Sequence, residues 1–190
     1  MDLKIATWNI LADDYASFVH NGKLKDNIQF LRFEKRCQKI KAEICDKSPD
    51  IMGLQEVDEI ECWMKIFNEM DYDIEYVQRP GKVDGCLVAW KRNLPLTMLS
   101  CRHVQYDDCM LPEVNNEGDS PQPLQCDDDN LAFKFLRHNV GLILDFELGG
   151  EEEEKVKFSF AVTHLYWNPA YPGTHHSISP NLMKFIVVYF

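Results

Sequence analysis

The chain has 190 residues, of which 45% are apolar, enough for one domain with a hydrophobic core and too few to expect two. Its formal net charge of −11 argues against a protein that holds duplex nucleic acid through a broad basic surface. Such binding depends on many contacts from Lys and Arg to phosphates. A phosphate-ester substrate would therefore need a bound cation or a local basic patch.

The seven cysteines are an odd number and form no Cys-x-x-Cys pair, which is typical of free thiols in a reducing compartment. The first residues already show a strand pattern, which argues against a cleavable signal peptide. The apolar run at 185–190 is far shorter than the roughly 20 residues that span a bilayer. We therefore expect a soluble protein without a membrane partner, in the cytoplasm or alternatively in the nucleus.

The first part of the chain alternates strand-like and helix-like segments. Residues 3–8 alternate as a strand does. From 32 to 47, apolar residues recur at intervals of three and four, which predicts an amphipathic helix. Residues 51–54 form a short buried strand, and a second helix is predicted at about 59–70. This order of elements predicts an α/β layered fold.

After the second helix, strand-like segments follow one another without helices between them, at 72–77, 85–90, 97–104, 139–147 and 156–163. Such a run favours a mixed sheet over a doubly wound one. Residues 105–130 are rich in Asp, Asn, Pro and Gln, which predicts a surface insertion. The acidic run at 127–129 is interpreted as a solvated loop rather than a cation site.

Polar residues stand where apolar strands end, at Asn9, Glu56, Asp84, Asn139 and His164. Sheet ends are where functional sites are built. A carboxylate at Glu56 is costly after a buried strand unless something pairs with it. A hard divalent cation such as Mg²⁺, bound by Glu56, the Asn9 amide and waters, would be such a partner. Taken singly, an Asn after a strand is usually a turn residue and a Glu there a surface charge.

His164 follows the apolar run 158–162. A lone histidine at such a place is more often a hydrogen-bonded structural residue than a catalyst. As a site residue it would stabilise charge on a phosphoryl oxygen or protonate a leaving group, and both roles suit its pKa. The residues alone leave both interpretations open.

Five short motifs occur in the order seen in the endonuclease/exonuclease/phosphatase superfamily, which the chain therefore resembles. They are residues 7–11, 54–57, 84–86 with 90–91, 139–141 and 163–169. The forms Thr-His-Leu-Tyr-Trp-Asn-Pro and Asp-Gly-Cys are similar to the branch that contains the cytoplasmic deadenylases, Nocturnin, Angel and the 2′-phosphodiesterase.

The resemblance implies half of a four-layer α/β sandwich, with a mixed sheet and helices on one face. It implies Mg²⁺, with Mn²⁺ as the alternative, and in-line attack by a metal-assisted water. Glu56 would be the direct metal ligand and Asn9 would belong to the metal site. His164 would contact the scissile phosphate, and Asn139 and Pro169 would bind substrate, with Pro169 holding the terminal base.

The family's second half carries an Asp-x-Asn motif and a terminal Asp-His pair, and neither follows Pro169 here. We therefore expect residues 1–169 to be the N-terminal part of such a domain and residues 170–190 to be a divergent tail. The first-sheet strands, which on this interpretation include 139–146, would then have one uncovered apolar face. A chain of this kind is expected to be inactive and either poorly soluble or dependent on a partner.

The lead hypothesis is a Mg²⁺-dependent 3′-exoribonuclease chain of the poly(A)-type deadenylase kind, inactive at this length. Its partners would be RNA 3′ ends or nucleotide phosphate esters. Other substrates within the branch are 2′-5′ linkages, cyclic phosphate ends and a nucleotide 2′-phosphate. An alternative of a different class is a non-catalytic isoform that binds a protein partner or regulates a full-length relative.

Overall fold

Residues 2–19, 32–108, 138–150, 155–164 and 185–189 are described by the computed structural model. In the first sheet the strand order is β1 (Ile5–Asn9), β2 (Ile51–Val57), β4 (Gly85–Lys91), β3 (Tyr72–Gln78). β1 runs parallel to β2, and the other pairs are antiparallel. The predicted mixed sheet is confirmed.

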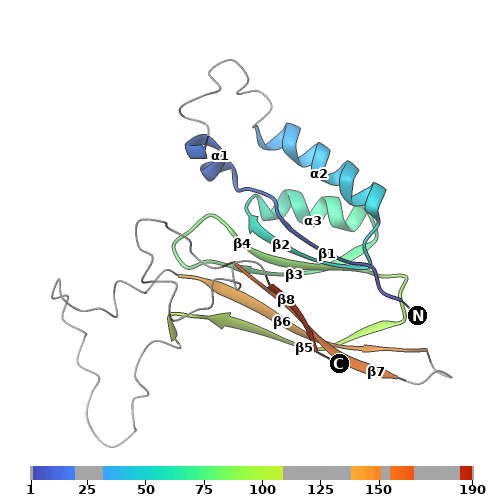
Figure 1. The fold of residues 1–190 in the computed structure, drawn as a ribbon. Helices are drawn as coiled ribbons and strands as arrows, with labels where there is room; N and C mark the ends of the chain where they lie inside the picture. The colour runs from blue at the N-terminus through green and yellow to red at the C-terminus, as the bar shows by residue number, and fades with distance from the viewer. Residues whose placement is uncertain (1, 20–31, 109–137, 151–154, 165–184, 190) are drawn as a thin grey trace, which may run out of the picture.

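Helices α1 (Asp13–Val19), α2 (Phe33–Lys47) and α3 (Ile60–Glu69) lie on one side of this sheet (Figure 1). α2 ends where Ser48 takes a left-handed conformation and its backbone N–H donates to the Ile44 carbonyl. The buried side chains of α2 and α3 recur at intervals of three and four. They pack on the sheet through Met52, Leu54 and Leu87, in one core together with Ile40, Ile44, Trp63 and Phe67.

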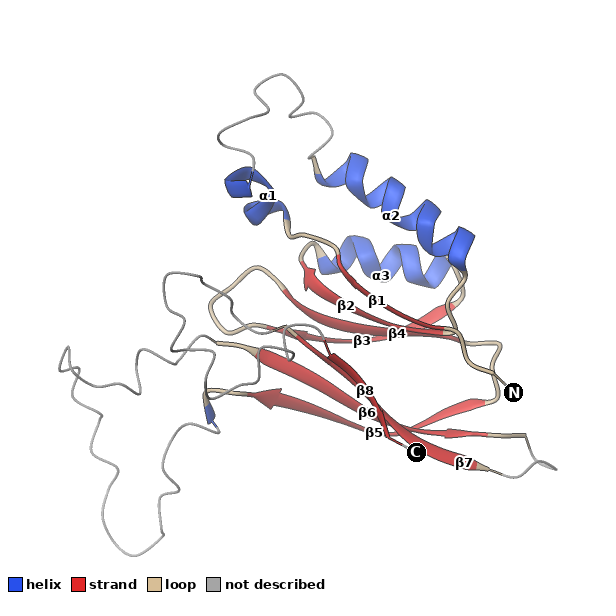
Figure 2. Cartoon of the chain, in the orientation of Figure 1, coloured by secondary structure: helices blue, strands red, loops and turns tan. Residues whose placement is uncertain are grey.

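A second sheet is entirely antiparallel and has the strand order β5 (Leu96–Gln105), β6 (Val140–Leu148), β7 (Val156–Thr163), β8 (Phe185–Tyr189). It stacks on the face of the first sheet that lies opposite the helices (Figure 2). The predicted place of residues 139–146 in the first sheet is wrong, because β6 pairs with β5 and β7 instead. The α/β class with helices on one face of the mixed sheet is as predicted.

The two sheets enclose a second hydrophobic core. Phe146 is fully buried there, with its ring centroid 5.4 Å from that of Trp90 on β4 and 5.6 Å from that of Phe158 on β7. At Gly53 the sheets approach so closely that a Cβ would lie 3.0 Å from Cγ2 of Val162. The prediction of an uncovered apolar face is therefore wrong, since the chain's own strands cover it. The expected poor solubility loses its physical basis.

The segment predicted as a divergent tail contains β8, which pairs with β7 so that Phe185 stands opposite Thr163. The boundary at residue 169 stays a prediction. Most of the surface insertion predicted at 105–130 lies outside the described residues, from 109 to its end. Within the described ranges, no helix combines the length and apolar character needed to cross a membrane.

Candidate functional site

The ends of β1 and β2 bring Asn9 and Glu56 to the same edge of the first sheet. The two strands are parallel, with Asn9 opposite Gln55. A bulge in β2 between Gln55 and Val57 interrupts the alternation of side chains, and Glu56 takes a φ of 55°. A left-handed backbone conformation costs a glutamate on the order of 1–3 kcal/mol, and strained residues of this kind are frequent at functional sites. The bulge re-aims the Glu56 carboxylate, a known use of this irregularity.

The Glu56 carboxylate is the centre of a small polar cluster. The Asn9 Nδ2 donates to Glu56 Oε1 at 2.7 Å, and the Ala12 backbone N–H donates to Oε2 at 3.3 Å. The His164 Nε2 lies 3.5 Å from Glu56 Oε1. The side chains are mostly buried, with 13% of Glu56 and 20% of His164 exposed. The structure thus brings together Asn9, Glu56 and His164, the three residues predicted to be catalytic.

The donor set around Glu56 fits a hard divalent cation. Glu56 supplies a largely desolvated carboxylate, which a cation would stabilise more than the neutral amide and backbone N–H do. The Asn9 Oδ1 accepts from the Leu11 N–H at 3.0 Å, and an amide oxygen has a second lone pair for a metal. Mg²⁺ is usually held by one or two carboxylates, with waters and substrate oxygens in its other positions.

Asn139 directly precedes β6, at the end of that strand where Gly141 pairs with Thr163. This register places Asn139 at the edge of the second sheet where His164 follows β7. The Asn139 side-chain oxygen is buried without a hydrogen-bond partner within the described residues. A buried acceptor of this kind costs about 1–3 kcal/mol unless a donor reaches it. Pro169, the other predicted substrate residue, lies outside the described residues.

A buried ion pair between Arg79 and Asp84 supports the turn between β3 and β4. The Arg79 Nη1 lies 3.3 Å from Asp84 Oδ2, and the side chain of Asp84 is fully buried. The Tyr15 hydroxyl of α1 donates to Asp84 Oδ1 at 2.8 Å. Burial and this hydrogen bond raise the pKa of Tyr15 to about 12. The sequence singles out Asp84 as a strand-end residue but misses Tyr15 and Arg79.

Tyr15→Phe removes the hydroxyl that reaches Asp84 and leaves the ring in place. A hydrogen bond to a charged group contributes about 1.5–3 kcal/mol to stability. Because Tyr15 is partly exposed, we expect the free energy of unfolding to fall by about 1–2 kcal/mol. Urea unfolding of the variant and the parent chain measures the difference. An unchanged midpoint and slope would show that α1 is not held by this contact.

Comparisons with known proteins point to one superfamily. No protein-family model matches the chain. The probable RNA exonuclease NGL3 of Saccharomyces cerevisiae is 25% identical over 172 residues, covering 89% of this chain and 30% of that protein. Protein angel homolog 2 of Danio rerio is 28% identical over 172 residues, covering 88% of this chain and 26% of that protein.

A solved structure of ANGEL2, a 2′,3′-cyclic phosphatase, in complex with adenosine-2′,3′-vanadate superposes with a TM-score of 0.61 at 25% identity. The match covers 90% of this chain and 44% of that one. The present chain thus spans less than half the length of these relatives.

The stacked sheets, the outer helices and the polar strand ends together define an α/β sandwich of the endonuclease/exonuclease/phosphatase type. Within that superfamily, the chain is similar to a probable RNA exonuclease and to Angel-type proteins, which is the resemblance that the motifs predict.

Proposed function

We propose that the chain belongs to a Mg²⁺-dependent phosphodiesterase of the 3′-exoribonuclease type, with poly(A)-like RNA 3′ ends as its substrate class. The observation that carries this proposal is the cluster of Asn9, Glu56 and His164, which combines a cation-binding donor set with an imidazole at one sheet edge. The relative NGL3, named as a probable RNA exonuclease, supports it. The similarity to ANGEL2, described as a 2′,3′-cyclic phosphatase, supports cyclic phosphate ends as the leading alternative substrate within the branch.

Each residue of the cluster has a distinct proposed role. Glu56, with Asn9, would hold the metal, whose chemistry is to polarise a phosphoryl oxygen and to lower the pKa of a bound water. His164 would donate an N–H to a phosphate oxygen and stabilise the charge that grows there during the reaction. The whole chain is acidic, so the positive charge of the bound metal is what would let an anionic substrate approach.

The limited coverage of the relatives supports a second candidate function. The chain matches 26% to 44% of their lengths, so more than half of each relative lies outside the match. In the second candidate, residues 1–190 bind a cation and an RNA 3′ end, or a protein partner, without turnover. The two candidates share the metal site and differ in whether the site serves hydrolysis. Hydrolysis by residues 1–190 alone would contradict the expectation that the chain is inactive at this length.

The test uses the 190-residue chain with a 5′-labelled oligoadenylate and with a matched strand that ends in a 2′,3′-cyclic phosphate. Each strand is incubated with Mg²⁺ and with a chelator, and the products are separated on denaturing gels. A Mg²⁺-dependent ladder of shortened products supports the 3′-exonuclease. Opening of the cyclic end without shortening supports the alternative substrate. Binding of metal and RNA without either product supports the second candidate, and an absence of metal binding contradicts both.

In a form of the domain that turns over, His164→Ala is expected to lower the single-turnover rate by about tenfold to a hundredfold, because the proposed N–H acts on charge in the transition state. RNA affinity is expected to change much less, which separates this role from substrate binding. His164→Asn, which keeps a donor near the same position, should recover part of the rate. A loss of thermal stability without this rate defect would assign His164 a structural role.

A further inference from the structure

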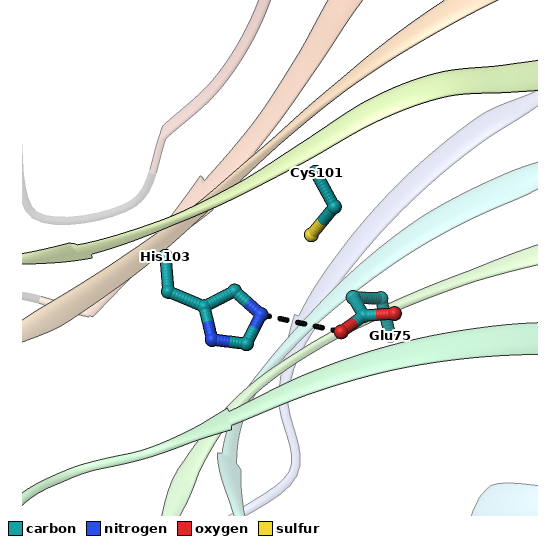
Figure 3. A group of neighbouring side chains, drawn as sticks. All are labelled: Glu75, Cys101 and His103. Carbon is teal, nitrogen blue, oxygen red and sulfur yellow. Dashed lines mark hydrogen bonds and ion pairs between the residues drawn. The ribbon is translucent and has the colours of Figure 1, made fainter.

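A second group of metal-binding side chains lies away from the strand ends, between the two sheets at one open edge. It consists of Glu75 on β3 together with Cys101 and His103 on β5. β3 and β5 are the edge strands of their sheets in the described fold. Figure 3 shows the Cys101 sulfur directed toward the His103 and Glu75 pair. The ligand atoms of the three residues all lie within 4.8 Å of one another.

Strand alternation explains why these side chains face each other. Val77, two residues from Glu75, packs in the core between the sheets, so Glu75 lies on the same inner face of β3. Cys101 also packs against that core, and His103 is two residues further along β5. The neighbouring Ser100 points outward and donates to Asp145 at 2.6 Å. The geometry is therefore set by two backbones rather than by one flexible loop.

We propose that Glu75, Cys101 and His103 form a binding site for Zn²⁺ that links the edge strands of the two sheets. Thiolate, imidazole and carboxylate are the ligands that Zn²⁺ takes in proteins, and three of them with a water make a four-coordinate site. The sulfur and the imidazole favour zinc over Mg²⁺. This site is thus chemically distinct from the oxygen-rich site proposed at Glu56.

The distances are compatible with such an ion. Tetrahedral zinc with bonds of about 2.0–2.3 Å holds its ligand atoms about 3.3–3.7 Å apart. The His103 Nε2 already lies 3.2 Å from Glu75 Oε1. The other distances between the ligand atoms are at most 4.8 Å. Small rotations of these side chains, which are not fully buried, would shorten them to the range that zinc requires.

The simpler interpretation is an ion pair between Glu75 and His103 alone, which would protect the sheet edge from pairing with another chain. That interpretation gives Cys101 no role. Zinc binding would release the thiol proton to solvent, and the thiolate and carboxylate would then balance the charge of the ion.

The test uses the untagged 190-residue chain, stripped of metal and titrated with Zn²⁺ in competition with a chromophoric chelator. Cys101→Ser and His103→Ala are each expected to weaken binding by about a hundredfold or more, beyond the effect of residues that only support ligands. Cys45→Ser, at an exposed cysteine of α2, is the matched control and should bind as the parent does. Co²⁺ should give a thiolate charge-transfer band in the parent and control, and none in Cys101→Ser.

A second measurement needs no variant. Zn²⁺ is expected to slow alkylation of Cys101 in the parent chain by at least about tenfold while Cys45 reacts at its usual rate, with both sites followed by mass spectrometry. Zinc held by other histidines would leave Cys101 unprotected. Equal alkylation of Cys101 with and without zinc, or unchanged zinc affinity in folded Cys101→Ser, would overturn the proposal.

Discussion

Glu56→Gln is expected to weaken divalent metal binding by about a thousandfold, with metal-dependent hydrolysis falling at least as far. Even two unit charges about 4 Å apart attract by about 4 kcal/mol at an effective dielectric constant of 20, and a divalent ion bound directly to the carboxylate would lose at least this attraction. The glutamine keeps the volume of the side chain and an oxygen that can still accept from Asn9. Titration with Mn²⁺, followed by its electron paramagnetic resonance signal, measures the affinity whether or not the chain turns over.

The matched control is Glu61→Gln, which removes one negative charge from an exposed position in the first turn of α3. It should bind the metal as the parent does. Asn9→Ala should weaken binding in the same direction but by less, because an amide oxygen carries no net charge. Circular dichroism confirms that the variants are folded. Normal metal affinity in folded Glu56→Gln would remove Glu56 from the proposed metal site.

Phe146→Ala is expected to destabilise the chain by about 3–5 kcal/mol, the usual cost of removing a fully buried phenylalanine. The reason is the cavity left between Trp90 and Phe158, which both contact the Phe146 ring. For a chain of this size, the loss corresponds to a fall in melting temperature of about 6–20 °C. Differential scanning calorimetry measures it.

Val156→Ala is the control for this prediction, because Val156 lies in the same sheet and is 44% exposed. Its effect should stay below about 1 kcal/mol, the usual range for surface positions. If Phe146→Ala were equally mild, the second sheet would not cover the first sheet as described, and the uncovered face predicted from the sequence would have to be considered again.

Local periodicity predicts α2, α3 and the strands from β1 to β7, but it misses α1 and β8 and does not give the partners of the later strands. The predicted helix at 32–47 is α2, Phe33–Lys47, because its apolar spacing is local information. β6 is harder, since residues 140–144 form a nearly continuous apolar run and Ile143 on the outer face hides the alternation. A run of this kind resembles a strand buried on both faces. Which sheet receives it depends on contacts distant in sequence.

The candidate site is predictable where polar residues directly follow buried strands. Asn9 and Glu56 meet because parallel strands bring their carboxyl ends to the same edge. Arg79 and Tyr15 reach Asp84 only after the β3–β4 turn and α1 have formed, and the sequence analysis predicts no helix at Asp13–Val19. An Arg and an Asp that flank a short Pro-Gly turn are a signal that could have predicted the ion pair.

The order of the strands along the chain has a consequence for folding. Among the described residues, the strands of the first sheet all lie before residue 92, and those of the second begin at Leu96 or later. Each sheet can therefore assemble from a continuous stretch of chain, and the loop-closure entropy of bringing distant segments together falls on the docking of one sheet against the other. During synthesis, the first sheet with its helices would emerge before its apolar inner face has a partner. That interval is when this chain is most exposed to aggregation, and it closes when β6 and β7 arrive.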